Sequence, residues 1–177
     1  MKKLTLSAML IFLMLTAVSC SKTEKSDLKF YVISRDMLSD SMSDSETVAA
    51  AVSDGRLAFD GDDIEGYNWQ THTVMLKEES VPSLGIISAE SGGSAVFKTD
   101  DTYAFVLALN SELIYVGGFS NGIKNPAVPL QPSIEDNGRY SFKITYNAKY
   151  ATSADPRSNV KLYNFLNGNG MLSSKSE

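Results

Sequence analysis

Residues 103–116, YAFVLALNSELIYV, decide the fold of this chain. Residues 103–109 are almost continuously apolar, and a second apolar run, 113–116, follows the polar break Asn110-Ser111-Glu112. Two apolar runs separated by a short polar break predict a β-hairpin. Because strands that are apolar on both faces are buried on both faces, we expect this hairpin, over about 103–118, at the centre of a sheet with cover on each side.

Other segments around the hairpin have the composition or alternation of strands. Residues 28–34, LKFYVIS, and residues 139–146, RYSFKITY, alternate with the period of two that a strand requires. The second of these segments follows Asn137-Gly138, a strong turn signal. Another strand is expected over 71–77, where His72 would lie beside apolar neighbours.

One helix is expected near the C-terminal end, over residues 155–167. Asp155 is placed to cap this helix, Pro156 suits its first position, and Asn167-Gly168 ends it. Apolar residues at three-residue spacing, beginning at Val160, give it a stripe that can pack on the sheet.

Weaker signals predict a short helix over 46–52 and a single helical turn through Tyr67, capped by Asp60 or Asp62. Glycine, proline and serine in 77–101 and 119–133 predict turns and loops. The predicted fold is therefore α+β: a small mixed or antiparallel sheet around a central hairpin, with one C-terminal helix packed on the sheet.

The first 19 residues have the organisation of a secretory signal peptide. Lys2 and Lys3 precede an uncharged apolar run over 4–18, and residues 17–19, AVS, supply small residues at a cleavage site. The run is shorter than the roughly 20 apolar residues that a membrane-spanning helix needs. We therefore expect residues 1–19 to be removed and the remainder to be exported.

Cys20 follows directly and is the only cysteine. Residues 17–20, AVSC, resemble the lipobox of bacterial lipoproteins, with Ala17 where that pattern most often has Leu. The resemblance implies that Cys20 carries a thioether-linked diacylglycerol, that cleavage occurs before it, and that its amino group is open to further acylation, for example by palmitate. Two or three acyl chains anchor a protein stably. The alternative is a chance cysteine beside an ordinary cleavage site.

The lone cysteine also limits the chemistry. It can form no intramolecular disulfide, and once lipidated it leaves no thiol for a nucleophile, a metal site or a redox motif. The sequence has no glycine-rich phosphate loop, and we expect no cofactor.

The predicted organisation is a signal peptide (1–19), a lipidated cysteine with a polar tether (20–27), one globular domain (28–172) and a frayed tail (173–177). Of 16 Lys and Arg residues, Lys2 and Lys3 leave with the leader, so 14 remain against 21 Asp and Glu and the net charge changes from −5 to −7. An acidic domain without a basic stripe argues against binding to nucleic acid. The expected partners are the membrane, through the lipid on Cys20, and an unknown protein or small ligand of the cell envelope.

Three segments share one further pattern: residues 62–77, DDIEGYNWQTHTVMLK, the hairpin region 103–119, and residues 155–166, DPRSNVKLYNFL. In this order they resemble an uncharacterised family of secreted bacterial proteins and lipoproteins, mostly Gram-positive, with the motifs DDIExYNWxTHxIxLK and DPRxDxxIYxALxxxGxL. Asn110-Ser111 and Asn159 depart from the family pattern. The resemblance implies one exported domain, and it implies no mechanism because the family has no established activity.

His72, the only histidine, is the candidate catalytic base. A Ser–His–acid hydrolase would need it beside a serine, but no serine lies in a G-x-S-x-G elbow, and zinc would need further His or Cys ligands. Asp62, Asp63 and Glu65 are the candidate catalytic acids. The competing interpretation is that His72 is a packing residue on a strand.

Two other groups of residues each have one structural and one functional interpretation. Trp69 and Tyr67 either pack a corner of the core or form a platform for a ligand. Asp60, Asp62 and Asp63 either cap a helix or supply oxygens to Ca²⁺, although their spacing does not follow an EF-hand loop.

Two functions are therefore carried forward. The favoured one is a membrane-anchored bacterial lipoprotein whose domain, on the outer side of the cell membrane, is a non-enzymatic binding domain. The alternative is an extracytoplasmic hydrolase that uses carboxylates and His72. An open cleft lined by His72 and Trp69, with an acid in hydrogen-bond reach, would favour the hydrolase.

Overall fold

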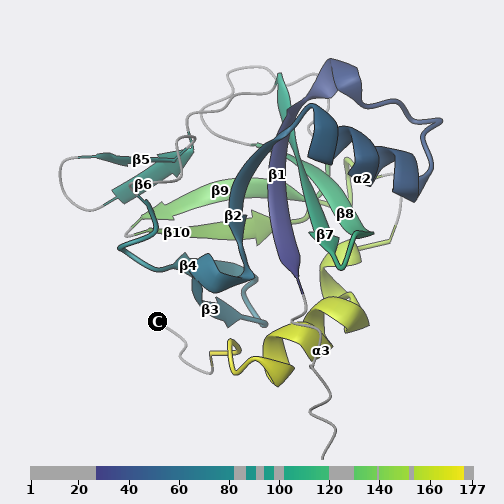
Figure 1. Ribbon diagram of the computed structural model, residues 1–177. Coiled ribbons are helices and arrows are strands. Elements are labelled where there is room, and N and C mark those ends of the chain that lie inside the picture. Colours follow the sequence, from purple (N-terminus) through teal and green to yellow (C-terminus); the bar gives the residue numbers. More distant parts are fainter. Residues whose placement is uncertain are drawn as a thin grey trace, which may run out of the picture.

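The eight strands of the main sheet are arranged in the order β2-β1-β7-β8-β9-β10-β4-β3 (Figure 1). The computed structural model describes residues 27–81, 87–90, 94–97, 102–119, 130–138, 140–151 and 154–173, so the leader, Cys20 and most of the tether lie outside it. The strands are β1 (Leu28–Ser34), β2 (Arg56–Asp60), β3 (Ile64–Asn68), β4 (Thr73–Leu76), β7 (Tyr103–Leu109), β8 (Glu112–Phe119), β9 (Ser133–Gly138) and β10 (Ser141–Thr145). All neighbours are antiparallel except β8 and β9, which are parallel. The predicted α+β class is confirmed.

The predicted hairpin is the centre of this sheet. Strands β7 and β8 are third and fourth of the eight and are joined by Asn110 and Ser111, whose φ angles of 52° and 63° are those of a type I′ turn. Alternate residues of β7 face opposite layers. Ala104 and Val106 pack in a cluster with Ala51, which belongs to a helix on the outer face, and Phe105 packs in the main core. The expectation of cover on both faces is therefore confirmed.

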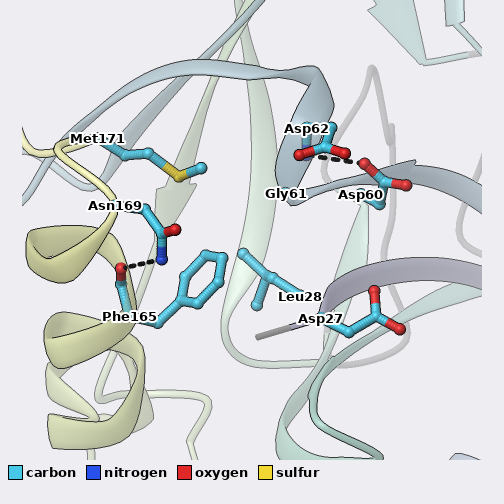
Figure 2. Close-up of a pocket in the computed structure, with 8 residues that line it drawn as sticks. All are labelled: Asp27, Leu28, Asp60, Gly61, Asp62, Phe165, Asn169 and Met171. Carbon is cyan, nitrogen blue, oxygen red and sulfur yellow. Dashed lines mark hydrogen bonds between the residues drawn. The ribbon is translucent and has the colours of Figure 1, made fainter. Parts of the chain in front are cut away.

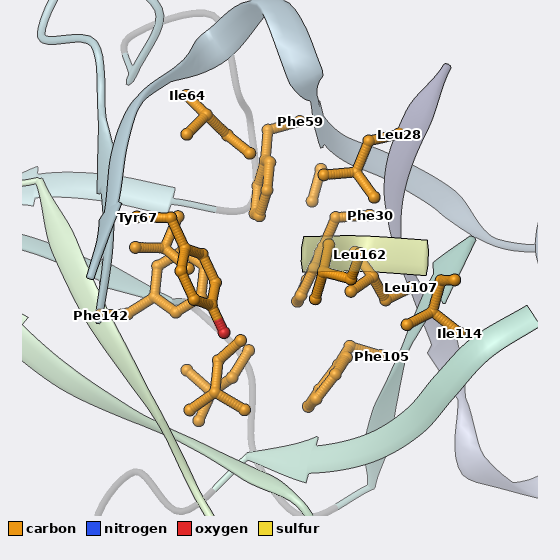
Figure 3. Close-up of a cluster of buried hydrophobic side chains, with 14 of the residues drawn as sticks. Leu28, Phe30, Phe59, Ile64, Tyr67, Phe105, Leu107, Ile114, Phe142 and Leu162 are labelled. Carbon is orange, nitrogen blue, oxygen red and sulfur yellow. The ribbon is translucent and has the colours of Figure 1, made fainter. Parts of the chain in front are cut away.

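The sheet curls until its two edge strands approach each other. Edge strands β2 and β3 are consecutive in the chain and are connected only by the 3-10 helix η3 (Gly61–Asp63). The ring of Phe30 stacks on rings of the two neighbouring strands, with its centroid 4.5 Å from that of Phe59 and 4.9 Å from that of Phe105. The curl also brings together rings of distant strands, because the centroids of Phe59 in β2 and Phe142 in β10 are 5.6 Å apart. Figure 3 shows these side chains around one interior.

Two α-helices cover the sheet. Helix α2 (Asp44–Ser53), which the sequence predicts over 46–52, begins at a capping box between Ser43 and Glu46 and packs on the outer face of the hairpin. Helix α3 (Val160–Gly168) lies below β1 and β7 in the view of Figure 1. Its Leu162, Phe165 and Leu166 side chains pack into the main core. The short 3-10 helix η2 (Arg35–Met37) follows β1.

The predicted helix over 155–167 is confirmed in place but wrong in its start. Asp155 caps a separate 3-10 turn, η5 (Pro156–Ser158), and α3 begins only after Asn159. Asn159 has extended backbone, and its side-chain oxygen accepts from the N–H groups of Lys161 and Leu162, so it is the true N-cap. Because the helix begins later than predicted, its buried face is formed by Leu162, Phe165 and Leu166. Val160 and Tyr163 are 67% and 39% exposed.

Several other secondary-structure predictions are wrong, because a short segment becomes a strand when a neighbouring strand pairs with it. The helical turn expected through Tyr67 ends at Asp63, and Tyr67 lies in β3, where it pairs with Val74. The predicted strand 71–77 shortens to β4. The segment 77–101, which was expected to be a loop, contains a separate hairpin of β5 (Ile87–Glu90) and β6 (Ser94–Phe97). Strands β2 and β9 had no predicted counterpart, and the loop expected over 119–133 overlaps β9 only at Ser133.

Candidate functional site

His72 lies in the turn between β3 and β4, and not on a strand as predicted. Its φ of 54° places the backbone in the left-handed region, and its side chain is 8% exposed. The ring Nδ1 is 3.0 Å from the hydroxyl of Tyr67, which is itself buried. The partner of Nδ1 is thus a tyrosine hydroxyl and not the carboxylate that orients a catalytic histidine.

The charges that act on His72 come from Arg157 and Asp155 and, to a smaller extent, from Lys143. The Arg157 guanidinium donates from Nε and Nη2 to the Asp155 carboxylate at 2.9 and 2.6 Å, and from Nη1 to the Ile144 carbonyl at 3.0 Å. The hydrogen bonds from Arg157 lower the pKa of Asp155. Burial, and then the charge of Arg157, lower the pKa of His72, so its ring is neutral at physiological pH.

Burial also raises the pKa of Tyr67 and of Tyr115, and both phenols stay protonated. The hydroxyl of Tyr115 is buried without a hydrogen-bond partner among the described residues. These two tyrosines and His72 form a polar set inside an otherwise apolar core, and no nucleophilic serine is part of it.

Trp69 packs over this corner. Its ring centroid is 5.8 Å from Tyr67, 5.7 Å from His72 and 5.0 Å from Tyr163. Neither Trp69 nor His72 lines any of the three cavities described below. The geometry therefore supports the packing interpretation of both residues.

Tyr67 lines one internal cavity, among the apolar side chains of the main core (Figure 3). Its volume is about 20 Å³. Ligand pockets typically measure about 300–1,000 Å³, so this space is a packing gap and not a platform for a ligand.

The acidic residues of the segment 60–63 lie in and before the 3-10 helix η3. This turn and the end of α3 form a second cavity of about 160 Å³ (Figure 2). Asp27, Asp60 and Asp62 line it together with Phe165. The Asp60 carboxylate accepts from the N–H of Asp62 at 2.8 Å, and the Asp63 carboxylate accepts from the N–H of Asp60 at 3.0 Å. These two carboxylates satisfy backbone donors of η3, which is the capping interpretation of the acidic cluster.

Metal and acid–base roles gain no support from this cluster. Within the described ranges, no group of three or more His, Asp or Glu side chains is arranged to hold a metal ion. Asp62 and Glu65 are exposed, whereas a carboxyl that serves as a general acid needs an apolar environment to hold its proton.

The largest of the three cavities is a trough of about 420 Å³ that the sequence did not predict. It lies between the start of β9 and the end of β10, and its lining includes Gln131, Glu135, Asn147 and Tyr150. The sequence signal that could have indicated this trough is the segment 145–150, TYNAKY, which has two tyrosines and an amide at the end of a predicted strand. Only the pairing of β9 with β10 brings Gln131 and Glu135 to the same place.

Cys20 lies outside the described residues, so its lipidation stays a prediction. No helix in the described part of the chain has the length and apolarity to cross a bilayer. Comparisons with protein-family models, with curated proteins and with solved structures found no match. The resemblance to the family of secreted bacterial proteins therefore also stays a prediction.

Proposed function

We propose that this protein is a membrane-anchored bacterial lipoprotein whose folded domain works outside the cytoplasm as a non-enzymatic binding domain. The observation that carries the proposal is the leader: two lysines, an uncharged apolar run and small residues end directly at the only cysteine. A cysteine in that position has a function as a lipid attachment site, and no second cysteine is present to offer it a disulfide.

The start of the domain fits such an anchor. Asp27 is fixed to the central hairpin, because its N–H donates to the Asn110 side chain at 2.9 Å and its carbonyl accepts from the Asn110 N–H at 2.9 Å. Cys20 to Asp27 is a stretch of chain that spans at most about 25 Å. A lipid on Cys20 would therefore keep the acidic end of the domain, with Asp27, Asp60 and Asp62, close to the bilayer.

That acidic end would not itself bind an anionic membrane. Anionic lipids attract basic clusters, and the cavity at this end is lined by three carboxylates and no Lys or Arg. The lysines beside it do not form a cluster, because Lys29 is paired with Asp27 and Lys77 donates to the Asp62 carbonyl. Membrane attachment in this proposal depends on the acyl chains alone.

A binding role fits the described chemistry better than hydrolysis. His72 is buried and hydrogen-bonded to a tyrosine, the candidate acids cap a turn or are exposed, and none of the three cavities described above joins His72 to a carboxylate. The open trough at β9 and β10 is instead lined by groups that can hold a ligand without transforming it.

The anchor is tested by the substitution Cys20→Ala in the bacterial host. Wild-type protein is expected in the membrane fraction and to incorporate an alkyne-labelled palmitate, while Cys20→Ala loses the label and the membrane association. Ser21→Ala, which changes the neighbouring residue, is the matched control and should behave as wild type. Recovery of Cys20→Ala in the detergent phase, or a mature wild-type mass without acyl chains, would refute the anchor.

A further inference from the structure

The trough has its own framework of fixed polar groups. Residues 131–135 form one wall and residues 145–150 the other, and adjacent strands β9 and β10 hold these walls together through paired residues such as Ser133 and Thr145. The volume of about 420 Å³ lies within the range of small-molecule sites. Seven of its eight lining residues carry a polar side-chain group, so it suits a polar ligand better than an apolar one.

Two amides on the walls of the trough have a fixed side-chain oxygen. The side-chain oxygen of Gln131 accepts from the N–H of Asn147 at 2.8 Å, and the side-chain oxygen of Asn147 accepts from the N–H of Lys149 at 3.0 Å. Because a backbone N–H can only donate, these bonds fix which side of each amide is the oxygen. The opposite side of each amide is therefore an NH₂ group, which is the hydrogen-bond donor that each residue could offer to a ligand.

The same walls supply acceptors. The exposed carboxylate of Glu135 is an acceptor, and the Thr145 hydroxyl lies 3.4 Å from it and 3.1 Å from the Ser133 hydroxyl. The Thr145 hydroxyl and the Glu135 carboxylate can accept from ligand hydroxyls, whereas the Ser133 hydroxyl, in a residue that is 4% exposed, supports Thr145 from behind.

Two tyrosine rings complete the site. Tyr146 is held by Arg157, whose guanidinium carbon lies 5.6 Å from the ring centroid and is itself fixed by Asp155. Tyr150 is 39% exposed at the other end of the wall. An aromatic face gives apolar contact to the C–H face of a sugar ring, while its hydroxyl remains in the polar surroundings.

The charges around the trough favour a neutral ligand. The lining includes one carboxylate, Glu135, and the Lys149 ammonium lies 5.4 Å from the ring centroid of the lining residue Tyr150, so neither sign is in excess and no cluster of cations is present in the lining to hold a phosphate or another anion. We propose that the trough formed by Gln131, Glu135, Thr145, Tyr146, Asn147 and Tyr150 binds a neutral saccharide. This inference rests on the binding role proposed above and gives that role a ligand class.

The test is a calorimetric titration of the full mature chain, purified in a detergent that has no sugar headgroup. The probes are the tetramer of N-acetylglucosamine, cellotetraose and maltotetraose, with tetra-alanine as the peptide probe. We expect saturable binding of at least one saccharide. Tyr150→Ala and the isosteric Asn147→Asp are each expected to raise its Kd by about tenfold, the equivalent of about one lost contact.

Tyr103→Ala is the matched control, because Tyr103 is 40% exposed against 39% for Tyr150 and is not among the trough residues. It should leave the Kd within about twofold. Urea unfolding followed by Trp69 fluorescence verifies that each variant is folded.

Three outcomes would overturn the saccharide site: no saturable binding of any of the three saccharides, binding that Tyr150→Ala and Asn147→Asp do not weaken, or binding of tetra-alanine in place of a saccharide. None of these affects the membrane fractionation of Cys20→Ala. A failed ligand class is therefore distinguishable from a failed anchor.

Discussion

At the scale of the residue, His72 combines a left-handed backbone with burial. Among residues other than Gly, this backbone conformation is most often adopted by Asn, Asp and His, and here it directs the imidazole under Trp69 and onto the Tyr67 hydroxyl. The residue therefore stabilises the β3–β4 corner in its neutral form. Protonation would place a charge in a buried site near Arg157, with Lys143 adding a smaller repulsion and Asp155 a partly compensating attraction.

This predicts a pH dependence of stability. The folded-state pKa of His72 is lowered from 6.5, so the unfolded chain binds the proton more readily, and the free energy of unfolding falls as the pH decreases below about 6.5. One such group contributes at most about 1.4 kcal/mol per pH unit. His72→Asn tolerates the left-handed backbone and keeps an acceptor near the position of Nδ1, but it does not titrate.

Urea unfolding between pH 7.5 and 5.5 measures this difference. The free energy of unfolding of the wild type should decrease more steeply than that of His72→Asn over this window. The lowered pKa of Asp155, from an ordinary 3.8, acts at more acidic pH and does not confuse the comparison. Parallel curves for the two proteins would show that His72 is not linked to folding.

At the scale of the element, the close approach of β8 to the segment before β9 depends on a glycine. A Cβ at Gly117 would lie 2.3 Å from the Phe105 ring and 2.3 Å from the carbonyl oxygen of Pro132. The parallel pairing of β8 with β9 begins at the next residue, Gly118, whose N–H donates to that same carbonyl. The wall of the trough that starts at Gln131 is therefore positioned by this contact.

Gly117→Ala is expected to lower the free energy of unfolding by about 3 kcal/mol, because neither the packed Phe105 ring nor the backbone of Pro132 can retreat easily. Gly168→Ala is the matched control. It lies at the end of α3 with no heavy atom within 4 Å of a new Cβ, and it should stabilise by about 0.5–1 kcal/mol. Equal stabilities for the two alanine variants would contradict the packing around β8.

At the scale of the whole molecule, one core connects the ends of the sheet. Phe30 and Phe59 come from β1 and β2, Phe142 comes from β10, and Leu166 of α3 packs in the same cluster. No large group of these side chains can be exposed without opening the others to water. The described domain should therefore unfold as a single unit.

The position of the only tryptophan makes this testable. Trp69 fluorescence reports the β3–β4 corner, whereas far-UV circular dichroism reports all strands and helices. We expect the two urea transitions to coincide in midpoint and slope. A fluorescence transition at lower urea would show that the edge formed by β3 and β4 opens separately from the hairpin.

The sequence predicted those features that a local pattern carries. The central hairpin, strand β1, strand β10 and helix α2 were found because apolar runs, period-two alternation or helix propensity lie within a few residues of each other. The start of α3 was misplaced because Asp155 and Asn159 are both N-caps, and the extended backbone of Asn159 divides the predicted helix into the 3-10 turn η5 and the helix α3. Strands β2 and β9 were not predicted, because they are strands through their pairing with β1 and β10 and not through a pattern of their own.

The sequence by itself determined the expected export signal and cysteine anchor, the acidic charge, the α+β class and the burial of the hairpin, because each depends on the order or number of residues along the chain. Only the tertiary structure decided that His72 is bonded to Tyr67, that the acidic residues cap a turn, and that Gln131 and Glu135 face Asn147 and Tyr150 across a trough. These relations join side chains through strand pairing and the curl of the sheet, and a local pattern in the chain does not encode such distances.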